Sequence, residues 1–285
     1  MSAILDRAAD FIYTHARLLE RLLFDVRFGS ATPGRVGQLV RAYQNSDGGL
    51  GYALEPDVRC SESQPLFVEI GLQALCDAGL REPVLSSTLC DYLDRVALPS
   101  GLVPILLPSA FEHPRAAHWQ SAWEPGLNPT ASLCGLLIWQ GIDHSWMERA
   151  TSACCDLLRT SNQPDAHDLL CAVRFVENLP DERLADELTA VIAAKLPGAP
   201  MFIATAPGEG YGLTPLEYAS TPKSRWRALF TEDQIAAHLD HLESSQQPDG
   251  GWQIAWEPPG SASVSEWRAR NTLKAVTTLA AYGRI

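Results

Sequence analysis

Two stretches of the sequence, Gln44-Asn45-Ser46-Asp47-Gly48-Gly49-Leu50-Gly51-Tyr52-Ala53-Leu54-Glu55-Pro56 and Gln246-Gln247-Pro248-Asp249-Gly250-Gly251-Trp252-Gln253-Ile254-Ala255-Trp256-Glu257-Pro258, align with one another without a gap. Both carry Gln, then Asp-Gly-Gly, then Ala-x-Glu-Pro at the same spacing. A third copy of the last part, Ala122-Trp123-Glu124-Pro125, stands between them. Such self-similarity indicates a repeated supersecondary unit.

Each full copy predicts a helical hairpin. An apolar helical pattern ends at the Gln, the Gly pair supplies the positive φ of a tight reversal, and the preceding Asp can hydrogen-bond within its own turn. A helix dense in small and apolar residues follows the Glu-Pro pair. Glu55, Glu124 and Glu257 are 69 and 133 residues apart, and 133 is close to twice 69. Amphipathic hairpins bury their faces by stacking, and about five or six of them can close into a ring.

Apolar residues recur at helical spacing along most of the chain, and strand-like alternation is almost absent. The first apolar stripe runs from Ile4 to Leu23. Further helices are expected at 33–43, 64–79, 82–95, 129–141, 144–160, 165–178, 181–196, 231–245 and 263–282. Two Pro-rich stretches, 96–127 and 197–226, are poorly helical, which is typical of a lid or a cavity lining. We therefore predict an all-α fold, an α/α toroid that forms one domain over residues 1–285.

The composition limits which binding partners and which cellular compartment we expect. The net charge is −12 and the pI is about 5.0, so that nucleic acid and anionic lipid would be repelled. The seven cysteines never have CxxC spacing, which favours reduced, buried thiols in the cytoplasm. No window reaches the roughly 18 apolar residues of a membrane span, and we expect no signal peptide at the N-terminus. The sequence leaves the oligomeric state open.

The pattern Gln-x-x-Asp-Gly-Gly-Trp at 246–252 resembles the QW motif of class II terpene cyclases such as squalene cyclases. It also resembles the Gly-Gly-Phe/Trp repeat of protein prenyltransferase β subunits, and 44–50 is a second copy with Leu for the aromatic residue. The run Glu124-Pro125-Gly126, followed by Ser-Leu-Cys-Gly-Leu at 132–136, is similar to a run in the same β subunits. The resemblance covers 44–285. It implies an α/α toroid whose inner helices point their N-termini at one rim of an apolar cavity, with an isoprenoid as the ligand.

The same resemblance implies that the three Ala-x-Glu-Pro loops gather at this rim, with Glu55, Glu124 and Glu257 on one face of the ring. The candidate substrate-binding residues are Tyr52, Trp123, Glu124, Trp256 and Glu257. Tryptophan faces stabilise carbocations by cation–π attraction, which suits an isoprenoid cyclase. Alternatively, the glutamates only cap helix N-termini, where negative charge is favoured.

A class II cyclase protonates its substrate with the central Asp of an Asp-x-Asp-Asp motif, and this chain has no such motif. The nearest sequence is Asp165-Ala166-His167-Asp168, directly before an apolar helix, with His167 where the acid would stand. Between two carboxylates His167 could serve as a proton donor. Alternatively, Asp165 is the N-cap of that helix. Glu55 and Asp57 form a second candidate acid pair, which completes the set of candidate catalytic residues.

Metal sites are not indicated by the sequence, and no cofactor is predicted. Asp-Asp-x-x-Asp is absent, so that Mg²⁺ enters only if a diphosphate is the substrate. Protein prenyltransferases use Asp, Cys and His ligands for zinc, and Cys134 with His113 or His118 does not assemble into that set.

Three hypotheses for the function follow. The repeats and tryptophans favour an isoprenoid-handling protein of the terpene cyclase/prenyltransferase-like class, in its enzymatic form a class II-type cyclase with an altered acid. The missing acid and metal motifs favour a non-catalytic toroid that binds an apolar ligand or a partner protein. A carbohydrate-active α/α barrel would use the same carboxylates and aromatic side chains, although the Gly-Gly-Trp repeats argue against it.

Overall fold

The computed structural model describes residues 2–119, 124–205 and 210–285, and these residues form helices and irregular connections. Within these ranges no strand occurs, and backbone pairing is limited to isolated β-bridges. This confirms the predicted all-α class. The helices belong to two compact units, which we describe separately: unit 1 comprises 1–32 and 201–285, and unit 2 comprises 33–200.

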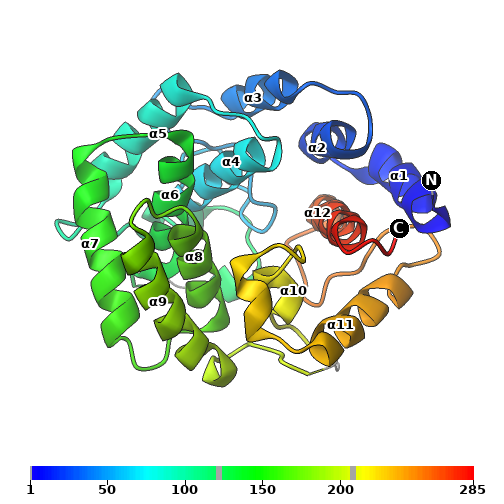
Figure 1. Cartoon of the computed structure of the whole chain (residues 1–285). Helices are drawn as coiled ribbons and strands as arrows, with labels where there is room; N and C mark the ends of the chain where they lie inside the picture. Colours follow the sequence, from blue (N-terminus) through cyan, green and yellow to red (C-terminus); the bar gives the residue numbers. More distant parts are fainter. Residues whose placement is uncertain (1, 120–123, 206–209) are drawn as a thin grey trace. The chain divides into compact units, whose positions relative to one another are not determined.

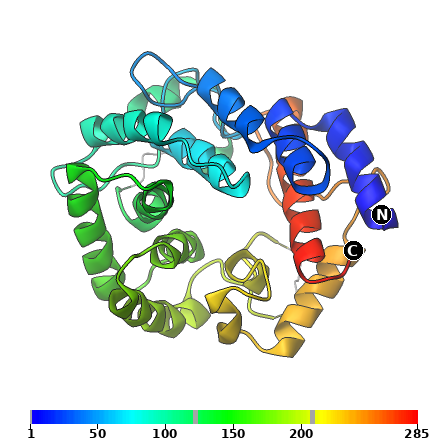
Figure 2. The same ribbon diagram turned by 45° about the horizontal axis from the view of Figure 1, so that its top comes forward.

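Unit 2 is a two-layered arrangement of helices (Figures 1 and 2). One layer contains α4 (Pro65–Asp77), α6 (Leu127–Gln140) and α8 (Ala166–Glu177). The other contains α3 (Pro33–Ala42), α5 (Pro83–Val96), α7 (Ser145–Thr160) and α9 (Glu182–Lys195). The chain alternates between the layers, so that each hairpin contributes one helix to each layer. Within the first layer α6 packs against both α4 and α8.

The two layers differ in sequence because they differ in surroundings. Almost every residue of α4 and α6 is buried, and both helices are apolar on nearly all sides. In contrast, α7 and α9 bury one apolar stripe and expose charged residues on the opposite side. A helix that is apolar all round must be covered by neighbours, whereas an amphipathic helix can border solvent. The sequence pattern thus assigns α4 and α6 to the covered layer.

Unit 1 contains α1 (Ala3–His15), α2 (Leu18–Phe28), α10 (Pro215–Tyr218), α11 (Glu232–Ser244) and α12 (Ser261–Ala281). The long helix α12 packs against α1, α2 and α11. The expectation of one apolar helical stripe from Ile4 to Leu23 is wrong in one respect, because the stripe is divided between two helices. Ala16 and Arg17 are extended, with ψ of 155° and 164°, and they separate α1 from α2.

The remaining expected helices are present, with ends shifted by at most two residues. In their described residues the Pro-rich stretches contain short helices: η1 (Pro108–Glu112) and η2 (Ala117–Trp119) in the first, and η3 (Leu196–Gly198), α10 and η4 (Arg225–Leu229) in or at the ends of the second. No helix within the described ranges has the length and apolar character that crossing a membrane requires. All seven cysteines are free, and all except Cys76 are buried.

The two Gly-Gly turns are held by equivalent hydrogen bonds. In the first, Gln44 Nε2 donates to the carbonyl of Gly48 (3.1 Å), and the amide of Gly49 donates to Asp47 Oδ1 (3.0 Å). The second turn repeats both bonds, from Gln246 to Gly250 (2.9 Å) and from Gly251 to Asp249 (3.1 Å). The next residue is buried in both copies, as Leu50 and Trp252. The sequence repeat is therefore a structural repeat.

Glu217 joins two elements of unit 1 and is expected to make the unit sensitive to acid. Its Oε2 accepts from the amide and hydroxyl of Thr214 at the start of α10, and its Oε1 accepts from Lys274 Nζ of α12 (2.7 Å). Burial alone would raise the pKa of Glu217, but the Lys274 charge and these hydrogen bonds outweigh burial and lower the pKa. The folded state therefore binds this proton more weakly than the unfolded chain.

The stability that Glu217 supplies is thus present above its unfolded pKa of about 4.5 and is lost as the pH falls through its lower folded pKa. Glu217→Gln should lower the free energy of unfolding by about 1–3 kcal/mol at pH 7. The loss should shrink below pH 4. Urea unfolding from pH 3 to 7 measures both effects, with Glu232→Gln as control because Glu232 is 92% exposed in its pair with Arg227. An equal loss at every pH would contradict this account.

Candidate functional site

Two distant loop segments of unit 2 lie side by side and position the candidate site. Asp57 lies in the loop between α3 and α4. Its carbonyl accepts a hydrogen bond from the amide of Ala116 (2.9 Å). The amide of Arg59 donates to the carbonyl of Pro114 (2.9 Å). These bonds fix the backbone of the first loop against the segment that leads into η2, which carries His118.

Asp57 and His118 form a pair at the boundary between interior and solvent. Asp57 Oδ2 lies 3.5 Å from His118 Nε2. The carboxyl group is only 2% exposed, whereas 45% of the imidazole surface is exposed. A buried carboxyl that contacts a half-exposed imidazole can exchange protons with solvent through that imidazole.

His118 is also within electrostatic reach of His167, which lies in the first turn of α8. Burial lowers the pKa of His118, and the charge of His167 lowers it further. A lowered pKa keeps His118 neutral at pH 7, so that it can accept a proton as well as pass one on. We call Asp57, His118 and His167 together the Asp57 cluster, because His118 contacts Asp57 and senses the charge of His167. It joins one member of each candidate acid set that the sequence indicates.

Glu55 supports the loop that carries Asp57. Its side chain is buried, and Oε2 accepts a hydrogen bond from the amide of Asp57 (2.8 Å). The carbonyl of Glu55 also accepts from the amide of Val58 (3.3 Å). These bonds orient the backbone of Asp57, which makes Glu55 a positioning residue in this geometry.

Asp165 and Asp168 form the capping box of α8. Asp165 Oδ1 accepts from the amides of His167 (2.8 Å) and Asp168 (2.9 Å), and Asp168 Oδ2 accepts from the amide of Asp165 (3.3 Å). Asp168 Oδ1 also accepts from the amide of Asn128, at the start of α6 (3.3 Å). Burial raises the pKa of Asp168, and the charge of Asp165 raises it further. The N-cap interpretation of this motif is confirmed, and the box fixes the helical turn that carries His167.

The predicted substrate-binding residues have unlike environments. Tyr52 is 56% exposed, and Glu124 and Glu257 are exposed as well. Trp123 lies outside the described residues. Glu55 is buried and therefore differs from its two sequence equivalents. Each of the three glutamates nevertheless precedes a helix, which is α4, α6 or α12.

Trp256 belongs to an aromatic group in unit 1. Its ring centroid lies 5.4 Å from that of Tyr211 and 5.0 Å from that of Trp267, both in edge-to-face geometry. The guanidinium of Arg270 lies 4.9 Å from the Trp267 ring. Tyr211 is 45% exposed, so that this group borders solvent. Its faces could bind an apolar or cationic group.

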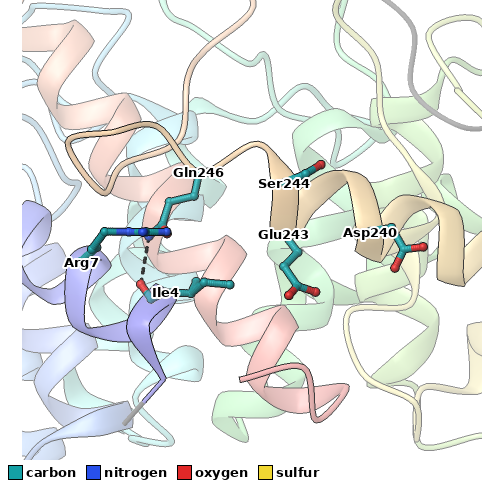
Figure 3. Close-up of a pocket in the computed structure, with 6 residues that line it drawn as sticks. All are labelled: Ile4, Arg7, Asp240, Glu243, Ser244 and Gln246. Atoms are coloured by element: carbon teal, nitrogen blue, oxygen red, sulfur yellow. Dashed lines mark hydrogen bonds between the residues drawn. The ribbon is translucent and has the colours of Figure 1, made fainter.

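Two surface depressions lie beside the repeated turns, and their walls are mainly polar. The first has a volume of about 510 Å³ and is lined by Ile4, Arg7, Asp240, Glu243, Ser244 and Gln246 (Figure 3). In it Gln246 Nε2 donates to the carbonyl of Ile4. The second, of about 290 Å³, is lined by Asn45, Ser46, Asp47, Tyr52, Ser61, Glu62 and Ser63. Neither is lined by a member of the Asp57 cluster.

Sequence reasoning considered His118 only as a zinc ligand and missed it as the partner of Asp57. His118 is 61 residues from Asp57 and 49 from His167, and no spacing connects the three. The sequence feature that could have pointed to His118 is the apolar, irregular stretch 96–127 around it, which is typical of a lid or a cavity lining. Across the described parts of the chain, no group of three His, Cys, Asp or Glu side chains is arranged to hold a metal ion.

Comparisons with known proteins extend the fold assignment only. No protein-family model matches the sequence, and no curated protein matches it. A solved structure of a protein from Actinoplanes is similar, with a TM-score of 0.58 and 18% sequence identity over 99% of each chain. At this identity the likeness concerns the fold.

Proposed function

We propose that this chain is an isoprenoid-handling protein of the terpene cyclase-like class, in which the Asp57 cluster supplies the acid–base chemistry. The observation that carries the proposal is the contact between the buried Asp57 carboxyl and the His118 imidazole, with the charge of His167 close by. Paired titratable groups in unlike environments are typical of acid–base sites. The QW-like repeats supply the substrate class.

In the proposed reaction, protonated Asp57 donates its proton to an alkene carbon of the substrate, which leaves a carboxylate and a carbocation. The cation cyclises by forming a carbon–carbon bond with a second alkene. Loss of a proton from the final cation to His118 then gives a neutral product, and transfer from His118 to Asp57 restores the acid. The number of protons is conserved, and no redox partner is needed.

The test is product formation from farnesyl diphosphate, geranylgeranyl diphosphate and squalene, with and without magnesium, analysed by mass spectrometry. Asp57→Asn and His118→Gln should each lower the rate about 10²- to 10⁴-fold, as loss of a general acid or base does. His167→Gln should change the pH dependence of the rate, because it removes a charge that lowers the pKa of His118.

Two matched controls separate chemistry from folding. His113→Gln removes another imidazole of the same loop, one that contacts the half-exposed Glu62 at 3.2 Å, and should leave the rate unchanged. Asp165→Asn retains a good N-cap and should also retain the rate. Absence of any cyclised product from the wild type would overturn the cyclase proposal. Product that survives in both Asp57→Asn and His118→Gln would show that the acid lies elsewhere.

A second candidate function is a non-catalytic protein that binds an apolar ligand. Backbone hydrogen bonding favours it, because such bonds account for three of the five predicted catalytic groups, Asp165, Asp168 and Glu55. This alternative predicts saturable binding of the same isoprenoids to the wild type and no turnover.

A further inference from the structure

Arg115 folds its side chain back over the segment that carries His118. Nη1 donates to the carbonyls of Phe111 (2.7 Å) and His113 (3.1 Å), and Nε donates to the carbonyl of Trp119 (2.8 Å). These carbonyls lie on both sides of Arg115 in the sequence, the first two at the end of η1 and the third at the end of η2. One guanidinium therefore joins the two short helices that flank it.

The irregular backbone of this segment explains why a side chain has this task. A 3₁₀ turn is closed by the N–H of the residue three places on. For Phe111 that residue is Pro114, which has no N–H. His113 is already extended, with φ of −116° and ψ of 160°, so that it lies beyond the helical turn. The several N–H groups of a guanidinium can satisfy carbonyls that the local backbone leaves without a donor.

The backbone of Arg115 is bound to the loop of Asp57. Arg115 and Val58 form an isolated antiparallel β-bridge between the two segments. The amide of Ala116, the next residue, donates to the carbonyl of Asp57. The side chain of Arg115 thus holds the end of the helix that carries His118, while its backbone is held by the loop that carries Asp57.

The positive charge of Arg115 serves no ion pair in the part of the chain that the structure describes. Its hydrogen bonds all go to backbone carbonyls, and its guanidinium lies 5.3 Å from the ring centroid of Phe111. In contrast, Arg41, Arg149 and Arg174 of the same unit each contact a carboxylate. The interactions of Arg115 therefore act on the shape of its own segment.

We propose that Arg115 is the positioning residue that keeps His118 in contact with Asp57. It binds the carbonyl of Trp119, one residue from His118, and so fixes η2 where Asp57 Oδ2 and His118 Nε2 are 3.5 Å apart. A proton can pass between the two groups only if this contact is kept. The inference deepens the proposed function and rests on it for the effect on the reaction rate. The effect on His118 itself requires no substrate.

Arg115→Lys tests the proposal, because lysine keeps the positive charge but its single nitrogen cannot replace the planar guanidinium. The charged groups that act on His118, Asp57 and His167, stay unchanged. We expect His118 to become more exposed, so that its pKa rises toward 6.5, since burial is the main cause of its lowered pKa. An NMR titration of the histidine rings measures this shift. The kcat of the proposed reaction should fall roughly 10- to 100-fold with KM unchanged, as misplacement by about 1 Å can cause.

Two controls separate positioning from a general loosening of unit 2. Arg95 also donates to a backbone carbonyl, that of Asp47 in the first Gly-Gly turn, and Arg95→Lys should leave the His118 titration in place. His144, which contacts Asp91 at 3.2 Å, is an internal control in the same spectra, and its titration should not change in Arg115→Lys.

A measurement on the wild type decides if Arg115→Lys fails to fold. The Nε–H of Arg115 donates to a carbonyl, whereas Arg95 donates only from Nη2 within the described residues. NMR should therefore show slower exchange with water for the Nε–H of Arg115 than for that of Arg95. Equal exchange of the two groups would overturn the inference.

The outcomes distinguish this inference from the proposed function. A His118 pKa that stays at its wild-type value in Arg115→Lys would overturn the positioning role, and so would a shift of His118 and His144 together. A wild type that makes no product, with the expected His118 shift in Arg115→Lys, would overturn the proposed function and support the positioning role.

Discussion

Gly250→Val is expected to lower the free energy of unfolding by about 2–6 kcal/mol, the sum of backbone strain and overpacking. Gly250 has a φ of +90°, which a β-branched residue tolerates badly. A Cβ at this position would also lie 2.1 Å from the carbonyl oxygen of Arg7 in α1. The substitution therefore forces the second turn away from α1 or distorts the helix.

Gly79→Val separates the two causes. Gly79 has a similar positive φ of +67°, but a Cβ there would meet no atom within 4 Å. Thermal or urea unfolding should therefore show a loss of about 1–3 kcal/mol for Gly79→Val, from strain alone. An unchanged melting temperature for Gly250→Val, or equal losses for both variants, would show that close packing on α1 contributes nothing.

The second large effect is expected at the contact between α6 and α8. A Cβ at Gly135 would lie 2.4 Å from the carbonyl oxygen of Arg174 and 2.8 Å from the Cα of Phe175. Both are backbone atoms, so that α8 as a whole has to move. We expect Gly135→Ala to lower the free energy of unfolding by about 1–3 kcal/mol, although the same exchange inside an exposed helix stabilises by about 1 kcal/mol.

Gly37→Ala is the matched control, because it is the same exchange in a helix without a backbone atom close to the added methyl group. Gly37 lies in α3, and the Cβ would meet the ends of the Glu82 and Leu80 side chains, at 2.8 Å each. Such side chains can turn aside, so we expect Gly37→Ala to be neutral or stabilising. Denaturant unfolding compares the two. A Gly135→Ala protein as stable as the wild type would contradict the close approach of α6 and α8.

Local sequence signals predicted the helices and the repeated turns. The turns could be predicted because their geometry depends on nearby residues: Asp47 binds the amide two residues on, and glycine permits the φ of +85° at Gly48. The break between α1 and α2 could not be predicted in this way. Ala16 and Arg17 are ordinary helix formers, and the apolar stripe continues across them, with Leu19 buried.

The candidate site could be predicted only in part. Asp57 and His167 stand next to recognisable motifs, but the sequence offers them as alternatives. Backbone bonds between two irregular loops bring Asp57 to His118, and local propensity carries no information about such pairing. The motif at Asp165 was recognised in the sequence, but its role was not. The pattern permits both a helix cap and a catalytic acid, and only the hydrogen bonds identify the cap.

The closed ring of hairpins, the single domain over 1–285 and the shared face of the three glutamates stay predictions. The two repeated turns lie in different units, with the first in unit 2 and the second in unit 1. Cross-linking of cysteines placed at two exposed positions, Tyr52 in the loop of Glu55 and Glu257, would test them together. A closed ring with these residues on one rim predicts an intramolecular cross-link by a reagent of ring-spanning length, and its absence at every reagent length would contradict that arrangement.

The central claim is that Asp57, His118 and His167 act as one acid–base group, and an NMR titration of the histidine rings tests it most directly. His118 should titrate below the ordinary value of 6.5, and His167→Gln should move its pKa upward, because the substitution removes a positive charge that lowers it. His113→Gln should leave the His118 titration in place. A His118 pKa at its ordinary value that does not respond to His167→Gln would contradict the claim.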